Sequence, residues 1–198
     1  MMKSIKIIAL SSVWLMMIWA CQPKEVYMPK QRGYYRMVIP DTGYQLLSKE
    51  YPYSFEYSQY AYIDDYDLHD SAQYWINVAY PQLNAVIYIS YHNFHGDSAL
   101  NVMINDSRSM VFKQISKADD VIESVIQDDS ANVYGKTYEI KGNEAACPFQ
   151  MWMTDKKKHF FRASLYFGCK PNNDSLQPAI DYISKDIMHM INTFKWNN

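Results

Sequence analysis

The spacing of apolar residues switches between two periods along this chain, and the order of the switches limits the folds it can adopt. Apolar and polar residues alternate, as they do in half-buried strands, in 34–39, 51–62, 74–80, 85–92, 133–140, 145–154 and 159–167. Apolar residues instead recur every three or four positions, as on one face of a helix, in 97–116 and 176–194. Segment 118–126 fits either a continued helix or a strand. The pattern therefore predicts strands, a helix, more strands and a final helix.

Short breaks between strand segments predict hairpins. Residues 81–84 join 74–80 to 85–92, and a charged turn over 155–158 precedes 159–167. Strands joined by such short turns pair antiparallel. We therefore predict an α+β fold, in which helices cover a mainly antiparallel β-sheet. The final helix is long and amphipathic, and its charged residues are expected to face water, namely Asp181, Lys185 and Asp186.

The start of the chain has the pattern of an export signal. A basic segment, 1–6, precedes the apolar run 7–19, which is shorter than the roughly 20 residues that a membrane-spanning helix needs. Ile18-Trp19-Ala20-Cys21 resembles a bacterial lipobox, whose cysteine is diacylated on sulfur and becomes the new N-terminus. An ordinary signal peptide with an incidental cysteine and an uncleaved anchor are the alternatives. We predict a signal peptide over 1–20, a lipid on Cys21, a tether over 21–28 and a single domain over 29–198.

Composition and charge exclude several classes of protein. The chain has 198 residues, of which 48% are hydrophobic, enough to form a core and too many for a disordered chain. Removal of 1–20 removes two of the 19 Lys and Arg residues, and the 17 that remain face 21 Asp and Glu. This negative charge argues against nucleic acid as a partner. The export signal and lipobox predict a protein of the bacterial cell envelope, held on a membrane through Cys21 and facing the periplasm.

The two remaining cysteines, Cys147 and Cys169, allow two readings. An oxidising compartment favours a disulfide between them. If the turn at 155–158 sets the hairpin register, however, Cys147 lies nearer to Tyr166 than to Cys169. Two separate buried or half-buried thiols are therefore the alternative.

Local signatures of catalysis are missing from the chain after Cys21. It contains no GxSxG, P-loop, GxGxxG, HExxH or CxxC motif, and we predict neither a metal nor a cofactor. Four groups of residues resemble sites only weakly: the pair His92 and His95, the acidic run 64–70, His159 beside three lysines, and the serines Ser54, Ser90 and Ser164. Repulsion from those lysines would disfavour protonation of His159, as in a general base, although a charged hairpin tip is the simpler interpretation.

Tyrosine and tryptophan are abundant, with 18 Tyr and five Trp residues. Aromatic faces stack on sugars, so exposed rings could form a platform for a glycan or peptidoglycan. Such a platform would need Tyr57, Tyr60, Tyr62 and Trp75 around one groove. The alternative is that these rings fill the core and its rim.

Blocks spread over nearly the whole chain after Cys21 resemble one family. The chain is similar to the gliding motility-associated lipoprotein GldD family in an ordered set of segments: 29–30, 32–36, 51–57, 75–77, 85–91, 117–119, 133–135, 142–143, 159–167, 171–176 and 193–196. The strand and helix order is also similar to small PsbP-like or Mog1-like α/β/α domains. That second resemblance concerns the fold alone.

The family resemblance implies a membrane-anchored, non-enzymatic component of the gliding machinery that some bacteria couple to type IX secretion. Its partners would be other envelope proteins of that machinery, and it supplies no catalytic residue. We expect the contact surface to include Arg32, Tyr34, Tyr35 and Arg36, because Arg and Tyr are enriched in interface hot spots and this stretch is close to the tether. An envelope glycan binder and a hydrolase without a recognised motif are the other two hypotheses.

Overall fold

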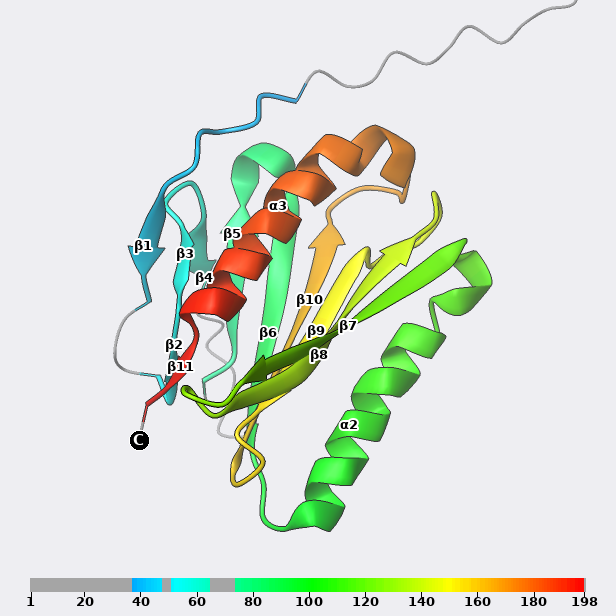
Figure 1. The fold of residues 1–198 in the computed structure, drawn as a ribbon. Helices are drawn as coiled ribbons and strands as arrows, with labels where there is room; N and C mark the ends of the chain where they lie inside the picture. Colours follow the sequence, from blue (N-terminus) through cyan, green and yellow to red (C-terminus); the bar gives the residue numbers. More distant parts are fainter. Residues whose placement is uncertain (1–36, 48–50, 65–73, 198) are drawn as a thin grey trace, which may run out of the picture. The chain divides into compact units, whose positions relative to one another are not determined.

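A seven-stranded antiparallel sheet forms the centre of the protein (Figure 1). The computed structural model describes residues 37–47, 51–64 and 74–197. The sheet has the order β4-β5-β6-β10-β9-β8-β7. Its strands are β4 (Tyr62–Asp64), β5 (Ile76–Tyr80), β6 (Ala85–Asn93), β7 (Asp120–Asp128), β8 (Val133–Lys141), β9 (Phe149–Thr154) and β10 (His159–Phe167). Each neighbouring pair is antiparallel.

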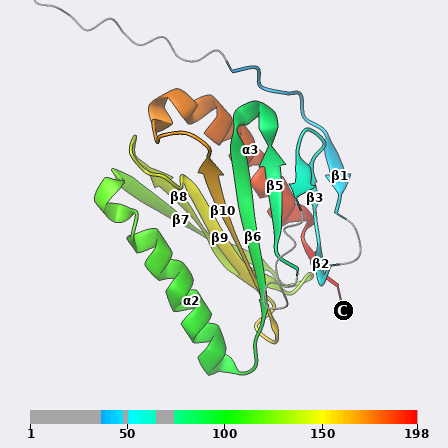
Figure 2. The ribbon, with the colours of Figure 1, turned by 180° about the vertical axis from the view of Figure 1, so that it is seen from behind.

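Short strands build two further small sheets. β1 (Tyr44–Leu46) pairs with β3 (Glu56–Ser58), and β2 (Tyr53–Ser54) pairs with β11 (Lys195–Trp196), both antiparallel. The second pairing brings the end of the chain beside residues that precede it by about 140 positions. Both small sheets lie beside the C-terminal helix (Figures 1 and 2).

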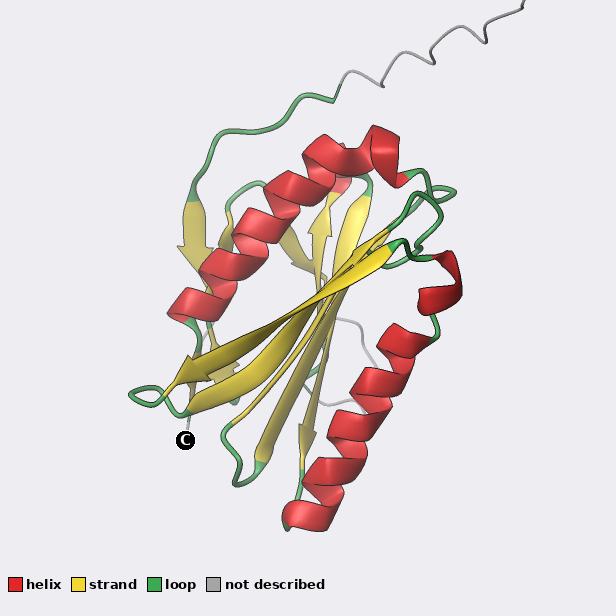
Figure 3. Ribbon diagram, turned by 45° about the vertical axis from the view of Figure 1, so that its right-hand side comes forward, coloured by secondary structure: helices red, strands yellow, loops and turns green. Residues whose placement is uncertain are grey.

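The two α-helices of the described residues lie on opposite faces of the large sheet (Figure 3). They are α2 (Asp97–Phe112) and α3 (Asn173–Thr193). α3 presents Ile183, Ile187 and Met190 to one face, where they join the larger core cluster. α2 contributes Val111 to a smaller cluster on the other face, with Trp152 and Phe160. These contacts make three layers, helix, sheet and helix.

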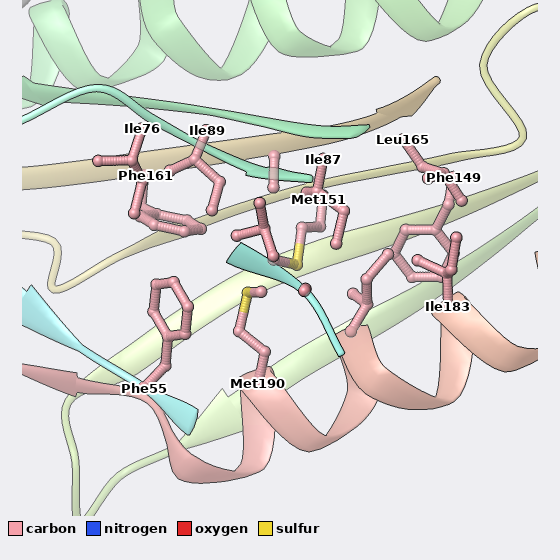
Figure 4. Packing of buried hydrophobic residues seen from close by; sticks show 14 of the residues in the cluster. Phe55, Ile76, Ile87, Ile89, Phe149, Met151, Phe161, Leu165, Ile183 and Met190 are labelled. Carbon is pink, nitrogen blue, oxygen red and sulfur yellow. The ribbon is translucent and has the colours of Figure 1, made fainter. Parts of the chain in front are cut away.

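Alternation along the strands explains how one sheet serves both clusters. On β10, Phe161 and Leu165 point to the α3 side, whereas Phe160 points to the α2 side. On β9, Met151 faces α3 and Trp152 faces α2. Figure 4 shows the α3 side, where Phe55, Ile76 and Ile87 meet Ile183 and Met190. Because this cluster draws on nearly every strand, the α3 side is the main core of the fold.

The predicted α+β fold with a mainly antiparallel sheet is confirmed. Both predicted hairpins are present, as β5–β6 around a 3-10 turn at Pro81–Leu83 and as β9–β10. Segment 118–126, which fitted either a helix or a strand, belongs mostly to strand β7. The long C-terminal helix is also present, and its apolar stripe packs on the sheet as expected.

Some element boundaries were predicted wrongly. Residues 37–39 of the predicted first strand form no strand, and 34–36 lie outside the described residues. Segment 51–62 is not one edge strand, because it divides into β2 and β3, with Tyr53 and Phe55 fully buried between helix and sheet. The final helix stops at Thr193, because Lys195 and Trp196 pair with β2 instead of continuing it.

Candidate functional site

The predicted lipid site and the predicted interaction face both belong to the N-terminal part of the chain. Cys21, Arg32, Tyr34, Tyr35 and Arg36 lie outside the described residues, as do the signal peptide 1–20 and the tether 21–28. The lipid site and the proposed interaction face therefore remain predictions from the sequence.

A groove crosses the face of the large sheet that α2 leaves uncovered, and we call it the sheet-face groove. Its volume is 490 Å³. It is lined by Tyr62, Asp64, Trp75, Asn77, Ala79, Val86, Tyr88, Ile89, Ser90, Met110, Arg162, Ser164 and Tyr166. A second hollow of 250 Å³ shares five of these residues and continues toward Asn84 and Gly168. Aromatic rings and polar groups thus alternate over one open surface.

Strand register sets the rows of this groove. In one row, Tyr62 of β4 lies opposite Ala79, which lies opposite Val86, which lies opposite Tyr166. The next row along the strands runs Asp64, Asn77, Tyr88 and Ser164. The third contains Ser90 opposite Arg162, with Trp75 just before β5. Small side chains therefore form the floor of the first row, between two tyrosine rings.

Contacts with neighbouring residues hold several rings of the groove in place. Trp75 Nε1 donates a hydrogen bond to the Tyr91 carbonyl oxygen (2.9 Å), and the Trp75 ring meets His92 edge-on at 5.3 Å between centroids. Tyr88 and Tyr166 also meet edge to face, at 5.8 Å. Tyr62 and Tyr88 are 52% and 49% exposed. The groove therefore offers ring surface to a ligand without a large rearrangement.

Arg162 is the cation of the groove. Its guanidinium is half-buried, and Nη1 donates to Met110 Sδ (2.7 Å), a weak acceptor. Burial lowers the pKa of Arg162, while Tyr166 and Asp106 oppose that shift. Within the described ranges the salt bridges join other residues, so Arg162 is not in direct ion-pair contact with a carboxylate there.

Two of the four aromatics predicted for a glycan platform line this groove. Tyr62 and Trp75 do so, whereas Tyr57 and Tyr60 do not. The sequence reasoning missed Tyr88, Arg162 and Tyr166. A usable signal existed, because polar or aromatic residues alternate with apolar ones on β6 and β10, as expected of strands with one open face.

Asp186 forms a second polar cluster, and its predicted position was wrong. We expected it to face water, but it is only 3% exposed. Its carboxylate accepts hydrogen bonds from the Tyr44 and Tyr80 hydroxyls, each at 3.2 Å. Burial raises the pKa of Asp186, although these two hydrogen bonds oppose the rise. The two tyrosines belong to β1 and β5. The helical pattern around Asp186 therefore could not indicate that it has these partners.

His159 is not an exposed histidine at a charged tip. It is buried, its Nδ1 lies 2.5 Å from the Tyr91 hydroxyl, and its ring stacks on Trp196 at 5.0 Å. Burial is the main reason that its pKa is lowered; Asp155 opposes the shift, and Lys158 contributes the repulsion that the sequence suggested. The turn itself is organised by Asp155 Oδ1, which accepts three backbone N–H bonds, from residues 157–159.

The two cysteines are free thiols in the structure. Cys147 is buried, whereas Cys169 is exposed and so differs from the buried or half-buried thiol of the second reading. Cys147 lies beside Tyr166, with which its side chain shares a hydrogen bond, as expected. Burial raises the pKa of Cys147 to about 12, which keeps the thiol protonated and unreactive at neutral pH.

Three further groups that resembled sites in the sequence are His95, Ser54 and the acidic run 64–70. His95 Nδ1 lies 2.6 Å from the Phe94 carbonyl oxygen, and Ser54 Oγ donates to Asn197 Oδ1 at 3.2 Å. In the acidic run, only Asp64 is described, as the last residue of β4. Over 37–47, 51–64 and 74–197, no three His, Cys, Asp or Glu residues are grouped to hold a metal ion. None of the helices described there is long and apolar enough to cross a membrane.

The described residues thus define an α+β domain with one partly open sheet face. The model of the family "Gliding motility lipoprotein GldD" matches residues 24–196, and the chain therefore belongs to this family. Membership confirms the resemblance drawn from the ordered sequence blocks. It also supports a membrane-anchored lipoprotein of the envelope that is associated with gliding motility.

Comparison with other proteins adds little beyond the family. No curated protein matches this chain significantly. The solution structure of cyanobacterial PsbP (CyanoP) from Synechocystis is similar with 11% identity and a TM-score of 0.43, over 80% of this chain and 95% of that one.

Proposed function

We propose that this lipoprotein acts as a non-enzymatic interaction module in the assembly of the gliding machinery and its linked type IX secretion apparatus. The observation that carries the proposal is the family match over residues 24–196, which begins three residues after the lipobox cysteine. The family model therefore covers nearly all of the chain that follows the lipid-bearing cysteine. A partner that binds this domain would be brought to the membrane surface.

The anchor is the lipid on Cys21. Burial in a bilayer contributes about 0.8 kcal/mol per methylene group, so two or more acyl chains hold a domain on a membrane stably, whereas one does not. The exported domain then faces the periplasm. Residues 22–28 keep it near the membrane, because so short a tether spans at most about 25 Å when fully extended.

The proposed contact surface includes Arg32, Tyr34, Tyr35 and Arg36. Arginine supplies several hydrogen-bond donors in a rigid plane, and tyrosine supplies a large ring with a polar end, which explains why both dominate interface energies. The stretch lies 11 to 15 residues after Cys21, so it stays close to the membrane, where other envelope proteins can reach it.

Co-purification tests this proposal. A C-terminally tagged full-length chain is recovered from cross-linked cells as wild type, as Arg32→Ala/Arg36→Ala, and as Arg108→Ala, which alters an exposed arginine on α2. We expect motility and secretion proteins to be recovered with the wild type and the Arg108 variant, and at least about fivefold less with the double variant. Equal recovery with all three would reject this surface. Recovery of no such protein with the wild type would reject the assembly role.

A further inference from the structure

We propose that the sheet-face groove binds an acidic saccharide, with sugar rings stacked on its tyrosines and a carboxylate of the sugar held by Arg162. This goes beyond an assembly role, since it assigns to the domain a ligand that is not a protein. The size of the sheet-face groove fits such a ligand, because its volume of 490 Å³ lies within the roughly 300–1,000 Å³ of small-molecule sites.

The shape of the groove suits an extended chain more than a compact molecule. The row from Tyr62 to Tyr166 crosses three gaps between strands, or about 14 Å at about 4.8 Å per gap. Ala79 and Val86 between them are small enough to leave the ring faces accessible. The hollow that continues toward Asn84 extends this surface along the strands. An oligosaccharide could therefore contact several rings at once.

The polar residues between the rings match the hydroxyl groups of a sugar. Asn77 and Ser164 line the groove and make no side-chain hydrogen bond to other residues in the described ranges. Their donors and acceptors are available to a ligand. A groove for an amphipathic helix would instead be continuously apolar, and a peptide that adds a strand would use a sheet edge and not this face.

Arg162 selects for an acidic ligand. Its planar guanidinium forms paired hydrogen bonds to a carboxylate, and such charge-assisted bonds are stronger in a partly buried setting. Within the described residues no salt bridge engages it, and Asp106 of α2 acts on it only through a longer-range attraction. Asp64 lies at the opposite edge of the groove, on β4, three strands away from β10, so this carboxylate does not pair with Arg162.

The test is calorimetric titration of the full-length lipoprotein in detergent with acidic saccharides: trigalacturonate, trimannuronate and the N-acetylglucosaminyl-N-acetylmuramic acid disaccharide. Trigalacturonate methyl ester is the uncharged control ligand. We expect at least one acid to bind saturably and the ester to bind at least about tenfold more weakly than its acid, the loss expected for a charge-assisted pair. The three acids separate exported polysaccharide from peptidoglycan as the source of the sugar.

Matched variants locate the binding. Arg162→Gln should weaken the acid about tenfold and leave the ester unchanged, whereas Tyr88→Ala should weaken both. Arg108→Gln and Phe112→Ala, exposed residues of α2 outside the groove, should change neither. Urea unfolding of each variant identifies any that fails to fold, and Tyr62→Ala then serves as a second ring variant.

The proposal is overturned if no acid binds, if the ester binds as tightly as its acid, or if Arg162→Gln leaves acid binding unchanged. These results concern purified protein, so none of them bears on co-purification of partners. Conversely, loss of the assembly role would leave the binding measurements unaffected.

Discussion

Asp186 shows how a polar residue can be part of a core. It lies on α3 among groups from three other elements: the Tyr44 and Tyr80 hydroxyls donate to it, the hydroxyls of Tyr182 and Ser58 are nearby, and His189 is on the same helix. A buried carboxylate needs such partners, because an unpaired one would cost several kcal/mol. The cluster ties α3 to β1 and β5, and its role is therefore structural.

Replacement of Asp186 by Asn should change how stability depends on pH. Burial raises the pKa of Asp186 in the folded state above its ordinary value of 3.8. As pH rises above that value, the carboxyl ionises first in the unfolded chain, which stabilises the unfolded state. The wild type should therefore lose stability relative to Asp186→Asn between about pH 4 and neutral pH.

Urea unfolding near pH 4.5 and near pH 7.5 measures this difference. Asp181→Asn is the control, because Asp181 is exposed on the same helix and accepts a hydrogen bond from Gln177 Nε2 (2.7 Å). A difference between wild type and Asp186→Asn that stays constant, or favours the wild type at the higher pH, would contradict the account.

At the scale of elements, β11 joins the end of the chain to the rest of the domain, although it is only two residues long. Trp196 stacks on His159 at 5.0 Å and meets Phe194 edge-on at 4.7 Å, and its Nε1 donates to the Asn132 carbonyl oxygen (3.0 Å). β11 also pairs with β2, which holds Tyr53 against the core. One tryptophan thus joins four segments that are far apart in the sequence.

Trp196→Ala should therefore lower the free energy of unfolding by about 2–3 kcal/mol, less than for a fully buried tryptophan because the ring is half-buried. Phe112→Ala, which truncates a 52% exposed ring on α2, should change it by no more than about 0.5 kcal/mol. Chemical denaturation of both variants provides the measurement. Equal effects would mean that β11 does not contribute to the core as described.

Long elements could be predicted from the sequence, and short ones could not. α2, α3 and the two hairpins depend on local periodicity and nearby turns, which a single sequence contains. β1, β2, β3 and β11 have two or three residues each, too few to show a period. The pattern accordingly gives no strand at Lys195 and Trp196, because their strand partner lies about 140 residues earlier.

At the scale of the whole molecule, the groove exists because α2 covers only part of its sheet face. α2 packs against β9 and β10, which leaves β4, β5 and β6 open on that side. The sequence indicated Tyr62 and Trp75 but not Arg162, because the pairing of β6 with β10 joins segments about 70 residues apart. Such long-range pairing cannot be inferred from the pattern of one strand.

The lipid anchor and the domain together form the central claim, namely that this protein acts in gliding from a membrane surface. The most direct test uses cells that lack the gene, complemented with wild type or with Cys21→Ala, and measures surface spreading. We predict that the deletion abolishes spreading and that only the wild type restores it, since removal of the lipid removes the attachment. Normal spreading of the uncomplemented deletion strain would contradict the claim.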